Sequence, residues 1–246
     1  MNRELQKRVF ITGGTGSVGQ SIIEAFTSKK YEIYFQFNKD EKTAETLIKK
    51  YNVKKIQIDF TKKFELPSIN FDIIVNNAGI NISDAMTHKV KNEDWSKTLS
   101  FNLEIPFKIV KKYLPYMVSQ KWGRIVNISS IYGLRATEQN LPYTVSKHGL
   151  TGITQTIAKE YASKGITCNE ICPSAIESKM MIRIAKKGAK KENSTVQQYL
   201  EEVSELIPAK RMAKPFEIAS LVVYLSSEEA GFINGCSIPI DGGLIC

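Results

Sequence analysis

Seven short runs of apolar and β-branched residues constrain the fold of this chain more than any other feature. They are Val9–Thr12, Ile33–Phe37, Ile56–Asp59, Ile73–Asn76, Ile125–Ser129, Ile166–Ile171 and Ser237–Ile240. Most are separated by segments long enough for a crossover helix, such as Val18–Ser28 and Asp40–Lys50. Because strands that alternate with helices form parallel sheets, the pattern predicts one α/β domain over 1–246, a doubly wound parallel β-sheet with helices on both faces.

Two longer helices are expected in the middle of the chain. One is predicted over 92–118, from a capping pattern at Asn92, with Pro106 and Pro115 bending or interrupting it. The other follows Pro142 and is predicted to run as far as Ser163.

The segment 177–210, between the sixth and seventh predicted strands, is read as an irregular, weakly amphipathic insertion. It lies beyond the carboxyl end of a strand, where a substrate lid is expected. Six basic residues stand against one acid, Glu192, within fourteen residues: Lys179, Arg183, Lys186, Lys187, Lys190 and Lys191. Either these side chains form a solvated helix face, or they attract an acidic carrier or a phosphorylated substrate.

Composition narrows the class of protein. The chain has 246 residues and no apolar stretch long enough to span a membrane, and the segment 1–14 lacks a signal-peptide core, so we expect a cytoplasmic protein. The cysteines form no CxxC pair and there are two histidines, so we expect neither a metal site nor a disulfide framework. These cysteines are Cys168, Cys172, Cys236 and Cys246.

The formal net charge of +9 leaves two interpretations open. The simpler one is a basic, solvated surface; the other is attraction for anionic cofactors, acyl carriers or nucleic acid. No cluster of aromatic and basic residues and no nucleic-acid-binding motif accompanies the lysines, so we expect no nucleic-acid partner.

A glycine-rich loop, Thr12-Gly-Gly-Thr-Gly-Ser-Val-Gly19, directly follows the first predicted strand and opens the first predicted helix. Glycines let the backbone approach a pyrophosphate, and the helix N-terminus offers free N–H groups to it. The loop therefore predicts dinucleotide binding. The second predicted strand is followed by Asn38 and Lys39, with no acid over 34–39 to hold ribose hydroxyls, which favours NADP, with NAD as the alternative.

A catalytic pair is expected on the second long helix. Tyr143 and Lys147 are four residues apart, so they share a helix face, and the lysine cation is expected to lower the pKa of the phenol. Ser130 lies thirteen residues before Tyr143 at the end of a predicted strand. The pair Tyr51 and Lys55 has the same spacing without such a serine, so it is not expected to be catalytic.

These features together resemble the short-chain dehydrogenase/reductase (SDR) family, in its shorter-chain branch, from end to end. Asn76-Asn-Ala-Gly79 looks like the family's NNAG motif, Asn102 matches the helix asparagine, and Asp241-Gly-Gly243 matches the C-terminal DGG. Pro173-Ser-Ala-Ile-Glu-Ser178 resembles the PGxxxT segment, with serine for glycine and for threonine. The glycine loop departs from TGxxxGxG, because Ser17 occupies the second glycine position.

The resemblance implies a Rossmann-type fold and an NAD(P)(H)-dependent oxidoreductase acting on CH–OH groups. It implies that Tyr143 is the catalytic acid, that Ser130 orients the carbonyl oxygen, that Lys147 tunes Tyr143 and holds the nicotinamide ribose, and that Asn102 positions a water. The expected cofactor contacts, with Asp59 on the adenine amine, are Thr12, Gly13, Thr15, Gly16, Ser17, Val18, Gly19, Asn38, Lys39, Asp59, Phe60, Asn77, Ala78, Gly79, Tyr143, Lys147, Pro173, Ile176 and Ser178.

The substrate is less constrained. The C-terminal third is similar to 3-oxoacyl-[acyl-carrier-protein] reductases of fatty acid biosynthesis, whereas segments near Lys147 and Cys172 resemble 3-hydroxybutyrate dehydrogenases. The latter carry a lysine where this chain has Asn140. Sugar dehydrogenases share every motif, so fold analogy cannot choose. A cofactor-sensing regulator without catalysis is disfavoured by the intact serine, tyrosine and lysine.

The family also implies a homotetramer. Four apolar residues at helical spacing, Leu103, Phe107, Val110 and Leu114, predict a symmetric helix–helix interface, with core packing as the alternative for some of them.

Overall fold

The computed structural model describes residues 6–246 and confirms the predicted fold class. One parallel seven-stranded sheet has the order β3-β2-β1-β4-β5-β6-β7. Its strands are β1 (Arg8–Ile11), β2 (Glu32–Phe37), β3 (Lys54–Gln57), β4 (Ile73–Asn76), β5 (Gly123–Ile128), β6 (Ile166–Pro173) and β7 (Ser237–Ile240). The segment 1–5, part of the stretch read as lacking a signal peptide, lies outside the described residues.

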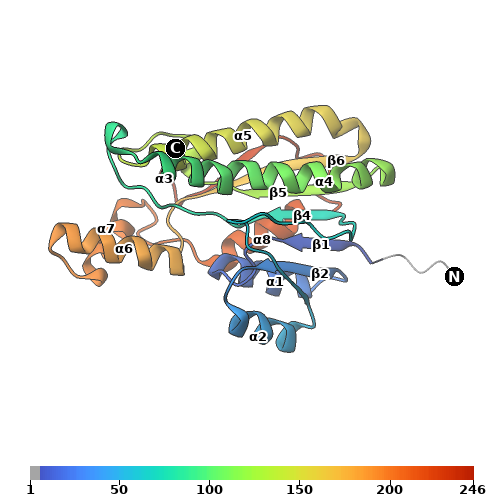
Figure 1. The fold of residues 1–246 in the computed structure, drawn as a ribbon, viewed down its shortest axis with the longest axis horizontal. Helices are drawn as coiled ribbons and strands as arrows, with labels where there is room; N and C mark the ends of the chain where they lie inside the picture. Colours follow the sequence, from blue (N-terminus) through green and yellow to red (C-terminus); the bar gives the residue numbers. More distant parts are fainter. Residues whose placement is uncertain (1–5) are drawn as a thin grey trace.

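Helices cover both faces of the sheet (Figure 1). The helices are α1 (Ser17–Thr27), α2 (Glu41–Tyr51), α3 (Asn92–Leu99), α4 (Ile105–Gln120), α5 (Leu141–Tyr161), α6 (Lys179–Glu192), α7 (Val196–Leu206) and α8 (Pro215–Leu225). Short turns of helix are η1 (Thr87–Lys89), η2 (Ser100–Glu104), η3 (Ile131–Gly133) and η4 (Ala162–Lys164). Among residues 6–246, none of these helices combines the length and apolarity that crossing a membrane requires.

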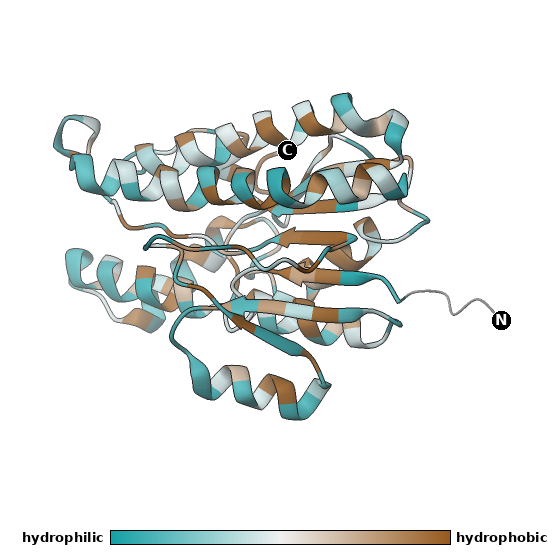
Figure 2. Cartoon of the chain, turned by 45° about the vertical axis from the view of Figure 1, so that its right-hand side comes forward, coloured by the Kyte–Doolittle hydropathy of each residue, from teal (hydrophilic) through white to brown (hydrophobic). Residues whose placement is uncertain are grey.

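Two apolar cores lie on opposite faces of the sheet. Val9 and Ile11 of β1 pack into one core with α1, α2 and α8, while Phe10 between them packs into the other with α4 and α5. This alternation follows from the two-residue period of a strand, whose side chains point to opposite faces in turn. Figure 2 shows the same pattern, with brown strands between helices whose outer sides are largely teal.

The predicted helix over 92–118 is present as one unbroken helical run that ends at Gln120, but its irregular turn does not lie at the prolines. The chain forms α3, then the π-helical turn η2, then α4. Pro106 lies directly after the π-helical turn, and Pro115 lies inside α4 without ending it. The irregular turn therefore falls at 100–104, and sequence periodicity gave no sign of it.

The expectation of an irregular, weakly amphipathic stretch at 177–210 was also wrong. Residues 179–206 are almost entirely helical, and α6 packs against α7 (Figure 1). Met181, Ala185 and Ala189 form a buried stripe along α6 at four-residue spacing, and Thr195 starts α7 with a capping box. The buried stripe is narrow and rich in alanine, and most of the other positions of α6 are basic or polar. The apolar pattern in the sequence was therefore too weak to reveal the helix. We call this unit the α6–α7 hairpin.

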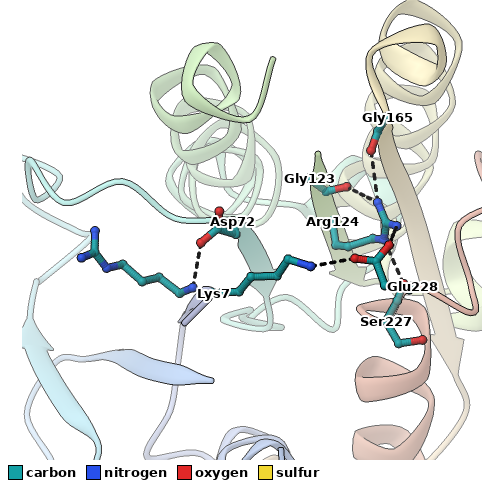
Figure 3. Close-up of polar contacts among 8 residues, drawn as sticks. Lys7, Asp72, Gly123, Arg124, Gly165, Ser227 and Glu228 are labelled. Atoms are coloured by element: carbon teal, nitrogen blue, oxygen red, sulfur yellow. Dashed lines mark hydrogen bonds and ion pairs between the residues drawn. The ribbon is translucent and has the colours of Figure 1, made fainter. Parts of the chain in front are cut away.

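The amino-terminal edge of the sheet is held together by charged groups (Figure 3). Arg124, at the start of β5, is buried and donates to the carbonyl oxygens of Ser227, Gly123 and Gly165 at 2.9–3.1 Å. Glu228 lies 3.6 Å from the same guanidinium and also pairs with Lys7 at 2.7 Å. Because these groups occupy the amino ends of the strands, the opposite edge is left for a ligand, as parallel sheets require.

Candidate active site

The glycine loop is shaped by close contacts at the carboxyl end of β1. Gly13 has a positive φ of 67°, and a Cβ at Gly19 would lie 2.3 Å from the carbonyl oxygen of Gly13. A Cβ at Gly14 would lie 2.6 Å from Phe35, so three glycines are sterically required. Gly16 is less constrained and forms the N-cap of α1, where no side chain caps the helix. The first turn of α1 thus offers uncapped N–H groups to an anion.

Thr12 and Asn77 lock the loop to the end of β4. The hydroxyl of Thr12 accepts hydrogen bonds from the backbone N–H groups of Asn77 and Ala78 at 3.0 and 2.9 Å. The amide of Asn77 donates to the carbonyl oxygens of Thr12 and Gly13. The predicted loop and NNAG residues therefore lie together at the switch point between β1 and β4.

Asp40, just beyond the range 34–39 in which no acid was found, lies between β2 and α2. Asn38 is half-buried and Lys39 is exposed, while Asp40 caps α2 by accepting from Thr43. The ammonium of Lys179, from the α6–α7 hairpin, lies 3.4 Å from the Asp40 carboxylate. This carboxylate is thus engaged by a helix cap and a lysine beside the expected adenosine end of the crevice.

Asp59 and Phe60 follow β3, two residues beyond where that strand ends. Asp59 accepts hydrogen bonds from the backbone and hydroxyl of Thr61, which lower the pKa of the Asp59 carboxyl below its usual value. Phe60 is buried in edge-to-face contact with Phe64 and Phe101. Phe60 therefore packs the core beneath the crevice, and the carboxylate of Asp59 is held by the turn that follows it.

Ser130, Tyr143 and Lys147 are brought together at the carboxyl end of β5. Ser130 lies beside Tyr143, and its hydroxyl accepts a hydrogen bond from the backbone N–H of Tyr132 at 3.2 Å. Lys147 is buried, and its ammonium donates to the carbonyl oxygen of Ile128 at 2.8 Å. That ammonium lies 5.5 Å from the centre of the Tyr143 ring.

The expected lowering of the phenol pKa by the lysine is not found. Burial raises the pKa of Tyr143 to about 12, and the neighbouring hydroxyl of Ser130 opposes this rise only in part. Burial likewise lowers the pKa of Lys147 to about 8, opposed mainly by the nearby carboxyl of Glu170. Both groups lose hydration, and the ammonium is directed to a carbonyl rather than to the phenol oxygen. The phenol is therefore fully protonated at neutral pH.

Asn102 is presented by the π-helical turn η2 and is buried. Its side chain exchanges two hydrogen bonds of 2.8 Å with the backbone of Ile80, just after the NNAG segment. It also donates to the hydroxyl of Ser146 at 3.1 Å, which in turn donates to the carbonyl oxygen of Tyr143. The asparagine side chain thus clamps the β4 loop to the first turns of α5.

Gly79 completes this cluster. A Cβ added there would lie 3.6 Å from the side-chain oxygen of Asn102 and 3.8 Å from the ammonium of Lys147. The NNAG segment therefore passes directly over both side chains, and the smallest residue keeps them accessible.

The segment 173–178 leads from β6 into the α6–α7 hairpin. Ser174 donates its N–H to the carbonyl oxygen of Ile240, and Ile176 forms an isolated bridge with Ala213. The hydroxyl of Ser178 caps α6 by accepting from Met181, which leaves its own proton free to donate. Ser17 is contacted here as well, because its hydroxyl accepts from the backbone N–H of Lys179 at 3.1 Å.

All six basic residues of α6 lie outside the core, yet two of them already have partners. Lys179 pairs with Asp40, and Lys191 pairs with Asp84 in the loop after β4 at 2.9 Å. The hairpin is thus tied to both sides of the crevice, and four basic residues remain without a salt bridge in the described chain. These are Arg183, Lys186, Lys187 and Lys190.

The predicted interface face on α4 is divided. Val110 and Leu114 are buried in the core, as the alternative interpretation proposed, and Leu103 packs against Gly149 of α5. Phe107 is 48% exposed and is the one of the four that faces outward. Core packing therefore accounts for Val110 and Leu114, and the helix–helix interface, to which Phe107 is left, stays a prediction.

The rejected pair, Tyr51 and Lys55, has contacts unrelated to this cluster. Lys55 forms ion pairs with Glu41 and Glu45, and Tyr51 is covered by the ammonium of Lys50 at 4.6 Å. Sequence reasoning also missed Gln36, whose side chain accepts from the N–H of Gly13 at 2.9 Å. A buried glutamine inside an apolar strand was the available signal.

Comparison with known proteins gives the family. A family model described as enoyl-(acyl carrier protein) reductase matches residues 13–245. Acetoacetyl-CoA reductase from Rhizobium meliloti is 32% identical, over 97% of this chain and 98% of the relative. 3-Oxoacyl-[acyl-carrier-protein] reductase from Aquifex aeolicus is 32% identical, over 99% and 100%. Glucose 1-dehydrogenase 2 from Bacillus subtilis is 31% identical, over 97% and 94%.

Solved structures agree in fold over the whole chain. A variant of actinorhodin polyketide ketoreductase with NADPH superposes with a TM-score of 0.90 at 25% identity, over 97% of each chain. ElxO with NADP bound gives a TM-score of 0.84 at 28% identity, over 98% of this chain and 99% of the other.

Proposed function

This chain belongs to the short-chain dehydrogenase/reductase family, and on that premise we propose that it reduces 3-oxoacyl thioesters with NADPH. The reaction class follows from the family: the chain is an oxidoreductase that transfers hydride between a nicotinamide and a carbonyl or secondary alcohol. The observation that carries the proposal is the cluster of buried Ser130, half-buried Tyr143 and buried Lys147, which accompanies the uncapped glycine loop at the carboxyl edge of the sheet.

The crevice fits a dinucleotide by its backbone. The N-terminus of α1 lacks a side-chain cap, and the close contacts at Gly14 and Gly19 leave no room for side chains that would cover it. The residues that would hold the cofactor are those of the glycine loop, the end of β2, the NNAG segment and Ser178. When bound, NADPH supplies the hydride. The choice of NADPH rests on Lys39 and Lys179, and is supported by the NADP-bound structures among the similar proteins.

The protein's own part in the reaction is proton donation and alignment. We assign Tyr143 as the acid, since its phenol stays protonated at neutral pH and can give its proton to a carbonyl oxygen. Ser130 donates a hydrogen bond to the same oxygen and fixes the carbonyl against Tyr143. Lys147 carries the charge that stabilises the phenolate left behind, and the Asn102 clamp holds α5 in register with the NNAG loop.

The substrate class rests on the relatives and on charge. Two of the similar proteins are named for 3-oxoacyl thioesters carried on coenzyme A or on an acyl carrier. Asn140 is uncharged where a 3-hydroxybutyrate dehydrogenase would hold a carboxylate with lysine, which disfavours a small hydroxy acid. The unpaired basic residues of α6 suit the phosphates of a carrier. A sugar alcohol is the second candidate, because glucose 1-dehydrogenase 2 is nearly as similar.

A panel of substrates tests the function. Acetoacetyl-CoA, a 3-oxoacyl-carrier conjugate, 3-hydroxybutyrate and glucose should each be offered with NADPH or NADP and followed by nicotinamide absorbance. We expect the two thioesters to be turned over at least about tenfold more efficiently, in kcat/KM, than the other two substrates. Faster oxidation of glucose would transfer the assignment to a sugar dehydrogenase.

We further propose a homotetramer in the cytoplasm. The exposed Phe107 on α4 and the exposed Val145 on α5 are apolar side chains that a second copy would cover. All four cysteines are free thiols, which is typical of a reducing compartment. Light scattering at micromolar concentration tests the assembly, and a monomer would contradict it.

A further inference from the structure

Three charged side chains are buried among residues 6–246: Arg124, Lys147 and Glu170. Arg124 has three carbonyl acceptors and a nearby carboxylate, as Figure 3 shows. Lys147 and Glu170 have no oppositely charged side chain within 4.0 Å, since neither makes a salt bridge within the described chain. One buried cation and one buried acid, both without a contacting counterion, therefore lie in the same half of the molecule.

Glu170 sits in the middle of β6 with no exposed surface. One carboxyl oxygen accepts from the hydroxyl of Thr151 at 2.7 Å and from the hydroxyl of Ser237 at 2.6 Å. The other oxygen is buried and has no hydrogen-bond partner among protein atoms in the described chain. A carboxyl group in such a place needs either a proton or a cation nearby.

Thr151 connects this acid to the catalytic helix. It lies one turn after Lys147 on α5, and its hydroxyl is 3.2 Å from the carbonyl oxygen of Lys147. The same hydroxyl donates to Glu170, so the carboxyl touches α5 directly beside the turn that presents the ammonium. The ammonium itself points to Ile128 on β5, the strand paired with β6.

No other group around the pair carries charge near neutral pH. The thiols of Cys168 and Cys172, which flank Glu170 on β6, have pKa values raised by burial, that of Cys172 to about 12. Tyr143, on the same helix as Lys147, has a pKa raised to about 12. Tyr132 on η3 and Asn102 on η2 complete the surroundings, and neither is an acidic or basic side chain. Only Lys147 and Glu170 can balance one another.

We propose that Glu170 is ionised and acts as the buried countercharge that keeps Lys147 protonated, which makes it a positioning residue for the reduction. The proposal rests on the proposed function, because it assigns Glu170 to the site that holds Tyr143 and Lys147. Without the negative charge of Glu170, Lys147 loses its proton at a lower pH. The alkaline limit of the reaction then moves to a lower pH as well.

The substitution Glu170→Gln tests this through the pH profile of carbonyl reduction. We expect the alkaline limb of kcat, near pH 8 in the parent protein, to move down by about one pH unit. The rate relative to the parent should then fall about tenfold at pH 9 and much less at pH 6.5. Glu170→Asp keeps the charge, so its alkaline limb should lie close to that of the parent protein. Ser237→Ala removes a hydrogen bond to the same oxygen but not the charge, and should leave the limb in place.

Two measurements without substrate separate this proposal from the proposed function. The titration of the Lys147 side chain, followed by NMR of its labelled Cε, should shift down in Glu170→Gln even if no substrate of the panel is turned over. In the unsubstituted protein, infrared spectra at pH 7 should show no C=O stretching band of a protonated carboxylic acid.

The outcomes are decisive in both directions. A downward shift of the lysine titration together with an ionised carboxylate supports the proposal. An unchanged alkaline limb and an unchanged lysine titration in Glu170→Gln overturn it. A protonated carboxyl band in the unsubstituted protein at pH 7 also overturns it, and this measurement remains decisive if the variant fails to fold.

Discussion

The residues around Tyr143, namely Ile80, Asn102, Ser146 and Lys147, form what we call the wall of the site. This wall and the α6–α7 hairpin are held in place by different kinds of contact. The wall is fixed by buried and partly buried hydrogen bonds of 2.7–3.1 Å, such as those of Asn102 with Ile80 and Ser146. The hairpin is fastened across the crevice by ion pairs whose side chains are largely exposed, Lys179 with Asp40 and Lys191 with Asp84.

The difference indicates how work is divided between the two regions. A buried hydrogen bond that loses its partner costs about 1–3 kcal/mol, whereas an exposed ion pair contributes about 0–1 kcal/mol. The wall is therefore rigid before any ligand arrives, which suits proton transfer at fixed geometry. The hairpin can release its ties cheaply, which suits a lid that opens and closes over cofactor and substrate.

The largest effect is expected at Tyr143, where the wall carries the chemistry. Tyr143→Phe removes the acid but keeps the ring that packs edge-to-face against Tyr132, so the fold should survive. We expect kcat to fall by at least about 10²–10⁴ with the Kd for NADPH nearly unchanged. Steady-state kinetics and fluorescence titration measure both.

The control for this substitution is Tyr51→Phe, because Tyr51 has the same spacing to a lysine. It should keep essentially full activity, since Lys55 is occupied by two glutamates. A Tyr143→Phe protein with more than a tenth of the parent activity would remove Tyr143 from the role of acid.

The buried ammonium of Lys147 should lower the free energy of unfolding of the protein. Its pKa is lowered from 10.5 to about 8, so the unfolded chain binds more protons than the folded chain between these values. The unfavourable contribution is thus fully present below pH 8 and is relieved as pH rises towards 10.5. Lys147→Met should remove it and abolish turnover, but it also leaves the Glu170 carboxylate without its countercharge, so the gain in the free energy of unfolding at pH 7 should be below about 3 kcal/mol.

Denaturant unfolding at several pH values tests this expectation. The free energy of unfolding of the parent should rise relative to that of Lys147→Met between pH 8 and 10.5. Equal stability of the two proteins at pH 7 would indicate that the buried ammonium is already fully compensated.

Asn102 tests whether the clamp is what makes the wall rigid. Asn102→Ala leaves the N–H and carbonyl of Ile80 without their partners, so we expect a loss of about 1–3 kcal/mol in the free energy of unfolding. The fall in kcat should exceed the change in KM, because α5 loses its register with the NNAG loop. Ser146→Ala, which removes one of the three contacts, should cost less in both measurements.

The smallest effects are expected in the hairpin. Lys179→Ala should weaken NADPH binding about threefold to tenfold, through loss of a cation beside the end of β2, with a smaller effect on NADH. Lys191→Ala should leave cofactor binding unchanged and alter the substrate KM by less than about threefold. Effects of both substitutions as large as that of Asn102→Ala would mean that the hairpin is part of the rigid wall.

Much of the candidate site could be predicted because its signals are local in the chain. Thr12–Gly19 follows a strand and opens a helix, and Tyr143 and Lys147 share one helix face, so spacing alone brings these residues together. The distinction from Tyr51 and Lys55 needed only Ser130 at the end of the preceding strand. The structure places these side chains together as spacing implied, although their roles stay predictions.

The pattern of apolar residues was enough to predict the parallel sheet, its two helical layers and the residues that gather at its carboxyl edge, because strands and helices each impose their own period on that pattern. Tertiary structure alone decided the π-helical turn that presents Asn102, the helical form of 179–206 and the direction of both pKa shifts at Tyr143 and Lys147. It alone revealed the burial of Glu170 beside the catalytic helix. These properties depend on which residues exclude water from which others, and that is settled only when distant segments pack together.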